Sequence, residues 1–591
     1  MRDLFRTESI ANYLRSKGFE TLDVTEEHIT IQYNIDDVKV GIKGVFSTRF
    51  PFELPSFYLI NRLGYGQLAH VSWTRNPELA EDDVGSICEG VTISRSVNYE
   101  FPELVFEYAL ESAIRTLTRV LSSDDINRAE VKSEFAGHWR FHCSTNTVRH
   151  IASMGAGEKP LKLSVYKLRS NVFSYTTSDP IVNEGYGLQP GKKDKPDHKG
   201  LYIPIKTPIL PPAPQQCILA WWHDTVLPVL SDDVRLFLAD VCKKHTSKYQ
   251  IFSVILSVTI GKGRLAWVGF NLTYKSRMSY NRKNQPPLFS GASLSGWSVK
   301  PFPVQVHNQD YLLPRGGVSG ELSTEKILVV GCGSLGGEIA RQLGYSGVGQ
   351  LDLVDFDSFE ADNIYRHVLP STYIGIDKCF ALKRHLENQF PYLVVETLNQ
   401  FKDLREISRV EKLETFLSQY DGVIVATGDV TQERYFNEVV SQLKNKPWVI
   451  YAWLEGYGVG GHSVFVNPEG RGCLACLFRD SESGEQSLSN IQNFLSINQD
   501  FAVDLSGCGT HFLPYGYTDV IETATLTTRI VEGIYNGSIG TSVRVSWKGN
   551  GREAKEAGLK MTGRWKRFKQ DRYPIPLVWS ECVTCGSSDD L

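Results

Sequence analysis

The sequence has no long hydrophobic run. Its longest purely apolar stretches span only a few residues, far short of the roughly 20 that a transmembrane helix needs. The first residues, Met1–Ser9, are charged and contain no apolar signal region. These absences predict a cytoplasmic protein with no membrane-spanning segment.

Charge of one sign is not in excess either. The chain has 63 Lys and Arg against 67 Asp and Glu, a formal net charge of −4, which argues against a general nucleic-acid-binding surface. The 11 cysteines in 591 residues are an odd number and do not suggest a disulfide scaffold, so a reducing compartment is favoured. At roughly 150 residues per domain, this length predicts three or four domains.

Residues 1–145 are predicted to form a compact α+β domain. Apolar spacing predicts a helix over residues 3–18, and alternation between residues 29 and 42 predicts an antiparallel meander. A helix over residues 102–121 begins with proline, which suits the first helical position. Its apolar face is predicted to contain Leu104, Tyr108, Ile114, Leu117 and Leu121.

Residues 146–314 are less informative. Strand-like alternation precedes a loop at residues 187–200 that is rich in Lys, Asp, Pro and Gly. No chemistry is evident in this region, so we expect an α+β linker or docking domain.

The pattern is clearer in the C-terminal half. A strand, then Gly331-x-Gly333-x-x-Gly336, then a helix predict a Rossmann-like α/β domain over residues 315–591 with a mostly parallel sheet. The glycines allow a tight turn and close approach to phosphate, and the helix N-terminus favours negative charge. Asp355 ends the second strand, where a carboxylate can bind ribose hydroxyls. Up to this point an NAD-dependent enzyme fits equally well.

Four further residues favour an adenylating site over hydride transfer. Asn363 and Arg366 follow the second strand, Lys378 comes soon after, and Asp429 ends a later strand. Two cations near a triphosphate would neutralise the charge that develops at its α-phosphorus, and Asp429 would hold Mg²⁺. Hydride transfer needs no such pair of cations. The pattern therefore predicts an ATP–Mg²⁺ site.

Two Cys-x-x-Cys pairs predict a metal site. Cys473/Cys476 and Cys582/Cys585 offer four thiolates, and a two-residue spacer lets both thiolates of a pair reach one zinc ion. The wide separation of the pairs excludes a compact zinc finger. We expect a structural zinc ion.

The C-terminal region resembles the ubiquitin-activating superfamily, whose bacterial members include ThiF and MoeB. The glycine motif and the five residues Asp355, Asn363, Arg366, Lys378 and Asp429 match that family's motif in order. The resemblance implies adenylation of the C-terminal carboxylate of a small protein, and a homodimer. It also implies an arginine from the N-terminal approach, for which Arg315 is the nearest candidate, and a thioester on Cys508, because members that form one carry their cysteine in this segment.

Residues 1–145 resemble ubiquitin-conjugating enzymes. The order helix, meander, proline-marked strand, histidine, cysteine and helix implies that Cys88 carries a thioester. The His-Pro-Asn tripeptide of eukaryotic members is replaced by Ala69-His70-Val71. No asparagine is therefore evident as an oxyanion donor, and His70 is interpreted as structural.

As a whole, the chain resembles bacterial fusions of a ubiquitin-conjugating domain, a linker domain and an activating domain from anti-phage CBASS systems. The resemblance implies that ATP activates the C-terminus of a cGAS-like nucleotidyltransferase, that Cys508 and then Cys88 carry the acyl group, and that a protein or small-molecule amine accepts it. No direct nucleic-acid contact is expected. The alternatives are a sulfur-carrier adenylyltransferase with a non-catalytic N-terminal docking domain and an NAD-dependent oxidoreductase.

Overall fold

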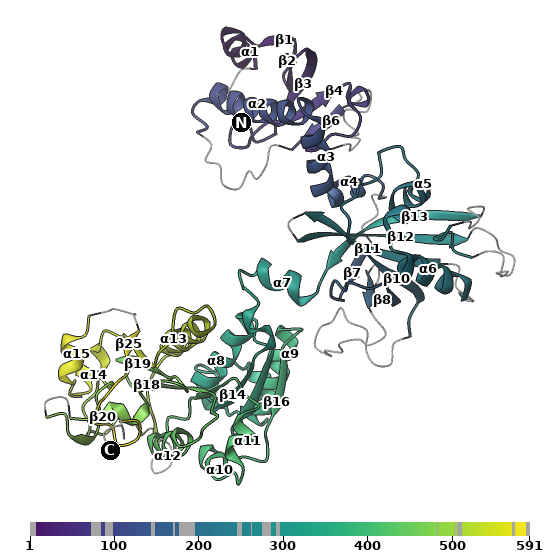
Figure 1. Cartoon of the computed structure of the whole chain (residues 1–591). Helices are drawn as coiled ribbons and strands as arrows, with labels where there is room; N and C mark the ends of the chain where they lie inside the picture. The colour runs from purple at the N-terminus through teal and green to yellow at the C-terminus, as the bar shows by residue number, and fades with distance from the viewer. Residues whose placement is uncertain are drawn as a thin grey trace. The chain divides into compact units, whose positions relative to one another are not determined.

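The computed structural model describes most of the chain in two compact units, one up to Asn308 and one from Gln309 (Figure 1). No helix among the described residues is both long enough and apolar enough to cross a bilayer. The described residues are 7–72, 84–88, 98–143, 148–169, 172–176, 195–244, 251–261, 263–274, 285–290, 296–480, 483–501, 503–504, 511–569 and 574–586.

The first part of the N-terminal unit is an antiparallel sheet packed with helices, as predicted. The strand order is β1-β2-β3-β4-β6-β5. The strands are β1 (Glu20–Val24), β2 (His28–Ile35), β3 (Val38–Val45), β4 (Ser56–Ile60), β5 (Val71–Ser72) and β6 (Val84–Ile87). The helices are α1 (Thr7–Ser16), α2 (Pro102–Leu121), α3 (Asp124–Ser133) and α4 (Phe135–Arg140).

Helix α2 has the predicted bounds but buries a different stripe. Leu104 and Tyr108 are exposed, so their placement on the buried face was wrong. The face of α2 that packs on the sheet contains Phe106, whose ring centre lies 5.2 Å from that of Phe57. The buried apolar residues of α2 are Val105, Phe106, Ala109, Leu110, Ala113, Ile114, Leu117 and Val120.

The second part of this unit is a closed barrel, in the order β10-β11-β12-β13-β7-β9-β8. Its closure is non-local, because Val304 pairs with His150 in parallel. The strands are β7 (Arg149–Ala152), β8 (Leu161–Arg169), β9 (Val172–Thr176), β10 (His198–Ile205), β11 (Ile251–Gly261), β12 (Arg264–Tyr274) and β13 (Trp297–Val306). Helices α5 (Ile218–Trp221) and α6 (Asp232–Lys244) accompany them.

The C-terminal unit is built on an eight-stranded sheet in the order β16-β15-β14-β17-β18-β19-β24-β25. The strands from β16 to β18 are parallel, and those beyond β18 are antiparallel. The strands are β14 (Lys326–Val330), β15 (Gln350–Val354), β16 (Val394–Thr397), β17 (Gly422–Val425), β18 (Trp448–Glu455), β19 (Gly460–Val466), β24 (Val543–Lys548) and β25 (Ile575–Pro576).

Both faces of this sheet are buried. Strand β14 contributes Ile327 and Val329 to one apolar cluster and Leu328 and Val330 to another. This arrangement confirms the predicted, mostly parallel, doubly covered sheet. The main helices are α7 (Gln309–Arg315), α8 (Ser334–Tyr345), α9 (Lys378–Gln389), α10 (Leu404–Ser408), α11 (Leu413–Leu417), α12 (Val430–Ser441), α13 (Tyr517–Tyr535), α14 (Arg552–Glu556) and α15 (Gly563–Arg567).

Candidate active site

The predicted nucleotide-binding residues lie where the parallel strands end. Gly331 follows β14, Asp355 follows β15, and Asp429 lies four residues beyond β17. Strand β14 lies between β15 and β17, so the strands that follow β14 in sequence are added first on one side of it, as β15 and β16, and then on the other, as β17 and β18. Open α/β sheets bind ligands at the carboxyl ends of strands beside such a switch point.

The three motif glycines have different structural roles. Gly331 has φ +89°, and a Cβ atom there would lie 2.6 Å from the Ala426 carbonyl oxygen. A Cβ atom at Gly336 would clash with the Gly331 carbonyl. At Gly333, the residue before α8, a Cβ atom would meet nothing within 4 Å. Two glycines therefore allow close packing, and the third leaves open space at a helix N-terminus, where an anion is favoured.

Asp355 holds this turn in place. Its Oδ2 atom accepts a hydrogen bond from the Cys332 amide at 2.7 Å, and its Oδ1 atom accepts one from the Asp357 amide at 2.9 Å. Burial raises the pKa of the Asp355 carboxyl. Ribose binding by Asp355 stays a prediction.

The predicted cations are positioned by neighbouring loops. Lys378 begins α9 and is buried, and its Nζ atom donates to Asp357 Oδ2 at 2.8 Å. The side-chain oxygen of Asn363 accepts a hydrogen bond from the Glu360 amide at 3.1 Å, and the backbone carbonyl of Asn363 accepts one from the Arg366 amide at 3.0 Å. Asn363 thus shapes the turn that carries Arg366.

The buried Nε atom of Arg366 has no hydrogen-bond partner within the described part of the chain. The guanidinium lies 5.5 Å from the centre of the Tyr515 ring. Buried donors are normally satisfied, so this nitrogen is available for a ligand.

A cavity of about 550 Å³ opens beside these groups. Among the predicted residues, Gly333 and Arg366 line it; Asp355, Asn363, Lys378 and Asp429 are not among its lining residues. Much of the remaining wall is apolar. It includes Trp453, Leu454, Leu474, Phe478, Leu495, Ile497, Phe501, Phe512 and Leu513.

Glu433 also lines this cavity and was missed in the sequence analysis. It is buried, and its Oε1 atom accepts from Thr427 Oγ1 at 2.8 Å and from the Gly428 amide at 3.2 Å. Burial raises the pKa of Glu433 to about 7. The sequence could have indicated Glu433 by its position one helical turn after Asp429. The Asp429 carboxylate caps α12 by accepting a hydrogen bond from the Thr431 amide at 3.0 Å.

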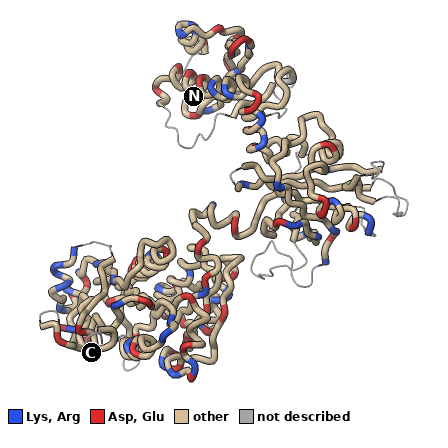
Figure 2. Tube along the Cα trace, viewed as in Figure 1, with Lys and Arg blue, Asp and Glu red and all other residues tan. Residues whose placement is uncertain are grey.

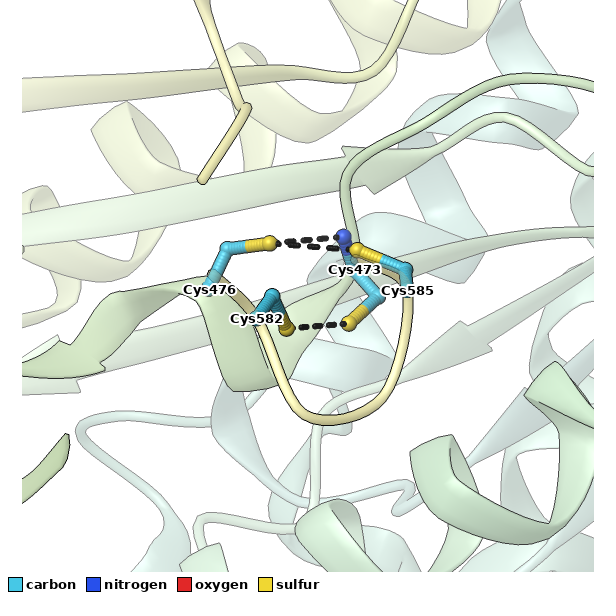
Figure 3. A group of neighbouring side chains, drawn as sticks. All are labelled: Cys473, Cys476, Cys582 and Cys585. Carbon is cyan, nitrogen blue, oxygen red and sulfur yellow. Dashed lines mark hydrogen bonds between the residues drawn. The ribbon is translucent and has the colours of Figure 1, made fainter. Parts of the chain in front are cut away.

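The four paired cysteines come together in the same unit. Their sulfur atoms all lie within 4.8 Å of one another, and the side chains point toward one another (Figure 3). The Cys473–Cys582 and Cys476–Cys585 sulfur distances are 3.7 and 3.4 Å. A tetrahedral zinc ion with Zn–S bonds of about 2.3 Å needs sulfurs roughly 3.8 Å apart. The cluster therefore fits zinc.

Cys88 lies directly after β6 and is exposed. His70, which has φ +59°, is held on both ring nitrogens: Nδ1 lies 2.6 Å from Glu134 Oε1, and Nε2 lies 3.1 Å from Glu130 Oε2. The hydrogen bond to Glu134 raises the pKa of His70, although burial opposes the shift. This ion pair supports the structural interpretation of His70.

Two predicted residues are not placed in a site. Cys508 lies outside the described residues. Arg315 is exposed at the end of α7, where its guanidinium donates to Tyr311 Oη at 3.3 Å. Its part in adenylation stays a prediction.

Comparison with known proteins identifies the C-terminal region. Residues 308–540 match the ThiF family, so the chain carries a ThiF-family domain. The chain is 26% identical to the ATP-dependent ubiquitin transferase-like protein Cap2 of Vibrio cholerae over 320 residues, which cover 52% of each protein. It is 27% identical to the Cap2 protein of Escherichia coli over 35% of this chain and 34% of that protein.

Other matches are shorter or more distant. A maize adenylyltransferase and sulfurtransferase, MOCS3-1, is 34% identical over 29% of this chain and 35% of its own length. The alignments to these three relatives span about half of their own length or less. The crystal structure of E. coli MccB is 16% identical, covers 45% of this chain and 67% of MccB, and has a TM-score of 0.32.

Proposed function

We propose that this chain uses ATP to activate the C-terminal carboxylate of a partner protein and then transfers the acyl group to an amine. The observation that carries the proposal is that Gly333, at an open helix N-terminus, and Arg366, with an unpartnered donor, line one cavity at the carboxyl end of a parallel sheet. This arrangement suits phosphate binding. The ThiF-family match and the name of the Cap2 relatives support the same chemistry.

In the first step, a carboxylate oxygen of the partner attacks the α-phosphorus of ATP. The bond to the bridging oxygen breaks, and pyrophosphate leaves with the electron pair. Arg366 and Lys378 stabilise the charge that develops. Asp429 would hold Mg²⁺, and Asp355 would bind the ribose. The apolar wall of the cavity suits the last residues of the partner.

The acyl group then moves between sulfur atoms. The Cys508 thiolate attacks the acyl carbon and AMP leaves; the Cys88 thiolate attacks next and the Cys508 thiolate leaves. An acceptor amine finally attacks the Cys88 thioester, loses a proton and releases the thiolate. The exposure of Cys88 supports this role.

The partner is proposed to be a cGAS-like nucleotidyltransferase, and the context an anti-phage CBASS system, because the sequence resembles CBASS fusion proteins and is similar to the Vibrio cholerae Cap2 protein over about half its length. We further propose a ubiquitin-conjugating-like domain at 1–145, a linker domain at 146–314 and an adenylation domain at 315–591 that forms a homodimer. The cysteine cluster would hold a zinc ion that stabilises this last domain.

The test separates adenylation from conjugation. The purified chain with ATP–Mg²⁺ and candidate partners should give reductant-sensitive adducts on a non-reducing gel. The Cys508→Ala variant should lose both adducts, and the Cys88→Ala variant should keep ATP–pyrophosphate exchange but form no conjugate. Conjugation that persists in Cys88→Ala would refute the relay.

A second candidate is a sulfur-carrier adenylyltransferase whose N-terminal region only docks the carrier. The similarity to the maize adenylyltransferase and sulfurtransferase favours it. In that case Cys88→Ala would leave every product unchanged, and a thiocarboxylated carrier would form in the presence of a sulfur donor.

A further inference from the structure

A second cavity in the C-terminal unit has an unusual concentration of positive charge. Its volume is about 530 Å³, and its wall contains four arginines: Arg479, Arg544, Arg564 and Arg567. Figure 2 shows basic residues along α15, which supplies two of them. None of the predicted nucleotide-binding residues or paired cysteines lines this arginine cavity.

Neutral groups hold two of these arginines in position. Arg544 Nη1 donates to Gln492 Oε1 at 3.1 Å, and Arg564 Nη2 donates to Ser546 Oγ at 3.0 Å. Arg564 also lies over the Phe568 ring, 4.9 Å from its centre. These two hydrogen-bond acceptors are neutral, and the Glu455 carboxylate acts on Arg564 only by charge attraction, which raises the pKa of Arg564 and partly opposes the effect of burial.

In the described part of the chain, the four arginines of this cavity have no ion-pair partner. Across the described ranges, no carboxylate lies within 4.0 Å of any of the four guanidinium groups. Among the described wall residues, Asp480 is the acidic one, and it is exposed.

Holding these charges together is costly. Burial, helped by Arg544, lowers the pKa of Arg564 to about 10, and burial with Arg479 lowers that of Arg544. Buried charges in proteins are normally paired. An anion in the cavity would offset this cost.

We propose that the arginine cavity binds a small phosphate-bearing anion of pyrophosphate or nucleotide size. Guanidinium groups match phosphate oxygens in bidentate geometry, and the volume lies in the range of small-molecule sites. The site is separate from the proposed adenylation chemistry and does not depend on it.

Calorimetric titration with inorganic pyrophosphate tests the proposal. Lys378→Ala removes a predicted nucleotide-site cation and so weakens pyrophosphate binding at that site; a further loss of binding on arginine substitution in this background reports the arginine cavity. Adding Arg567→Gln, or Arg479→Gln with Arg567→Gln, should weaken that remaining binding at least tenfold. Arg567 is exposed, so its replacement should leave folding intact, which an unchanged melting temperature would verify.

Arg552→Gln is the matched control, because Arg552 is an exposed arginine that pairs with Glu556 outside the cavity. It should leave pyrophosphate binding unchanged. Equal weakening in Arg552→Gln, unchanged affinity in the double arginine variant, or no binding in the Lys378→Ala background would each overturn the proposal. Titrations with AMP and ADP distinguish the source: tighter binding of ADP than of pyrophosphate indicates a nucleotide, and the reverse indicates free pyrophosphate.

Discussion

The amide nitrogen of Cys88 donates a hydrogen bond to the carbonyl oxygen of His70 at 2.7 Å. The His70 amide in turn donates to Glu134 Oε2 at 2.7 Å, and its ring pairs with the same carboxylate group. The exposed thiol is therefore attached to backbone whose position depends on this histidine–glutamate pair. The pair lies beside the proposed transfer site and contains no group that must itself react.

Replacing His70 should impair transfer to Cys88 without affecting adenylation. His70→Ala leaves Glu134 without its ring partner and frees the segment to which the Cys88 amide is bonded, so we expect at least a tenfold slower appearance of the Cys88 thioester. ATP–pyrophosphate exchange should remain unchanged. His28→Ala, which breaks a 2.8 Å pair with Asp23 in the same unit, is the control. Equal rates in wild type and His70→Ala would contradict the prediction.

Lys378 should be needed for adenylation. Lys378→Ala removes a cation proposed to stabilise the developing phosphate charge, and loss of one such group typically costs about 10²–10³ in rate. ATP–pyrophosphate exchange measures the effect. Arg384→Ala removes an exposed cation from the same helix and should leave exchange within about twofold of wild type. Similar losses in both variants would mean that helix charge, rather than Lys378, matters.

Glu433 should make the stability of the C-terminal unit depend on pH. Its pKa in the folded state is about 7, above the ordinary glutamate value of 4.5, so between these two pH values the folded state binds a proton that the unfolded state has released. Stability from this group is present below the unfolded pKa and declines as pH rises toward about 7. Glu433→Gln stays neutral, so it should raise the melting temperature at pH 8 and change it little at pH 4.

The pKa difference limits the loss of unfolding free energy from Glu433 between low and high pH to about 3 kcal/mol. Glu438→Gln, on the exposed side of the same helix, is the control and should not alter the pH dependence. If the melting temperatures of wild type and Glu433→Gln change with pH in the same way between pH 4 and 8, the buried carboxyl does not titrate in this range.

Metal removal should destabilise the C-terminal unit. If the cysteine cluster holds zinc, the purified chain should contain about one equivalent by elemental analysis. Cys582→Ser should lose it and melt several degrees lower, because metal binding contributes to folding. Cys217→Ser changes an exposed free thiol and should affect neither quantity. Full zinc content in Cys582→Ser would exclude the cluster as the site.

Local features of the fold could be predicted because they depend on neighbouring residues. Pro102 marked the start of α2, and the glycine motif placed the turn between β14 and α8. The buried stripe of α2 could not be predicted, since it is the sheet that selects Phe106 over Leu104 and Tyr108. The barrel was missed for the same reason, because its closure joins residues 150 and 304.

In the candidate sites, too, features set by neighbouring residues could be predicted and features set by tertiary contacts could not. The cysteine pairs were recognised by spacing, and they do converge. The arginine cavity has no local motif, because its arginines come from β20 (Phe478–Arg479), β24 and α15, which only folding brings together. Glu433 has its hydrogen-bond partners Thr427 and Gly428 close in sequence, but its burial was not evident from the sequence.

The cysteine cluster has a topological consequence. Cys473 and Cys582 are separated by 109 positions in sequence, so a shared metal ion would close the intervening polypeptide into a ring. Ring closure of that length restricts the unfolded ensemble and favours refolding, by an amount that grows slowly with the number of enclosed residues. A peptide-bond cut inside the ring would leave the two halves tethered until a chelator released them.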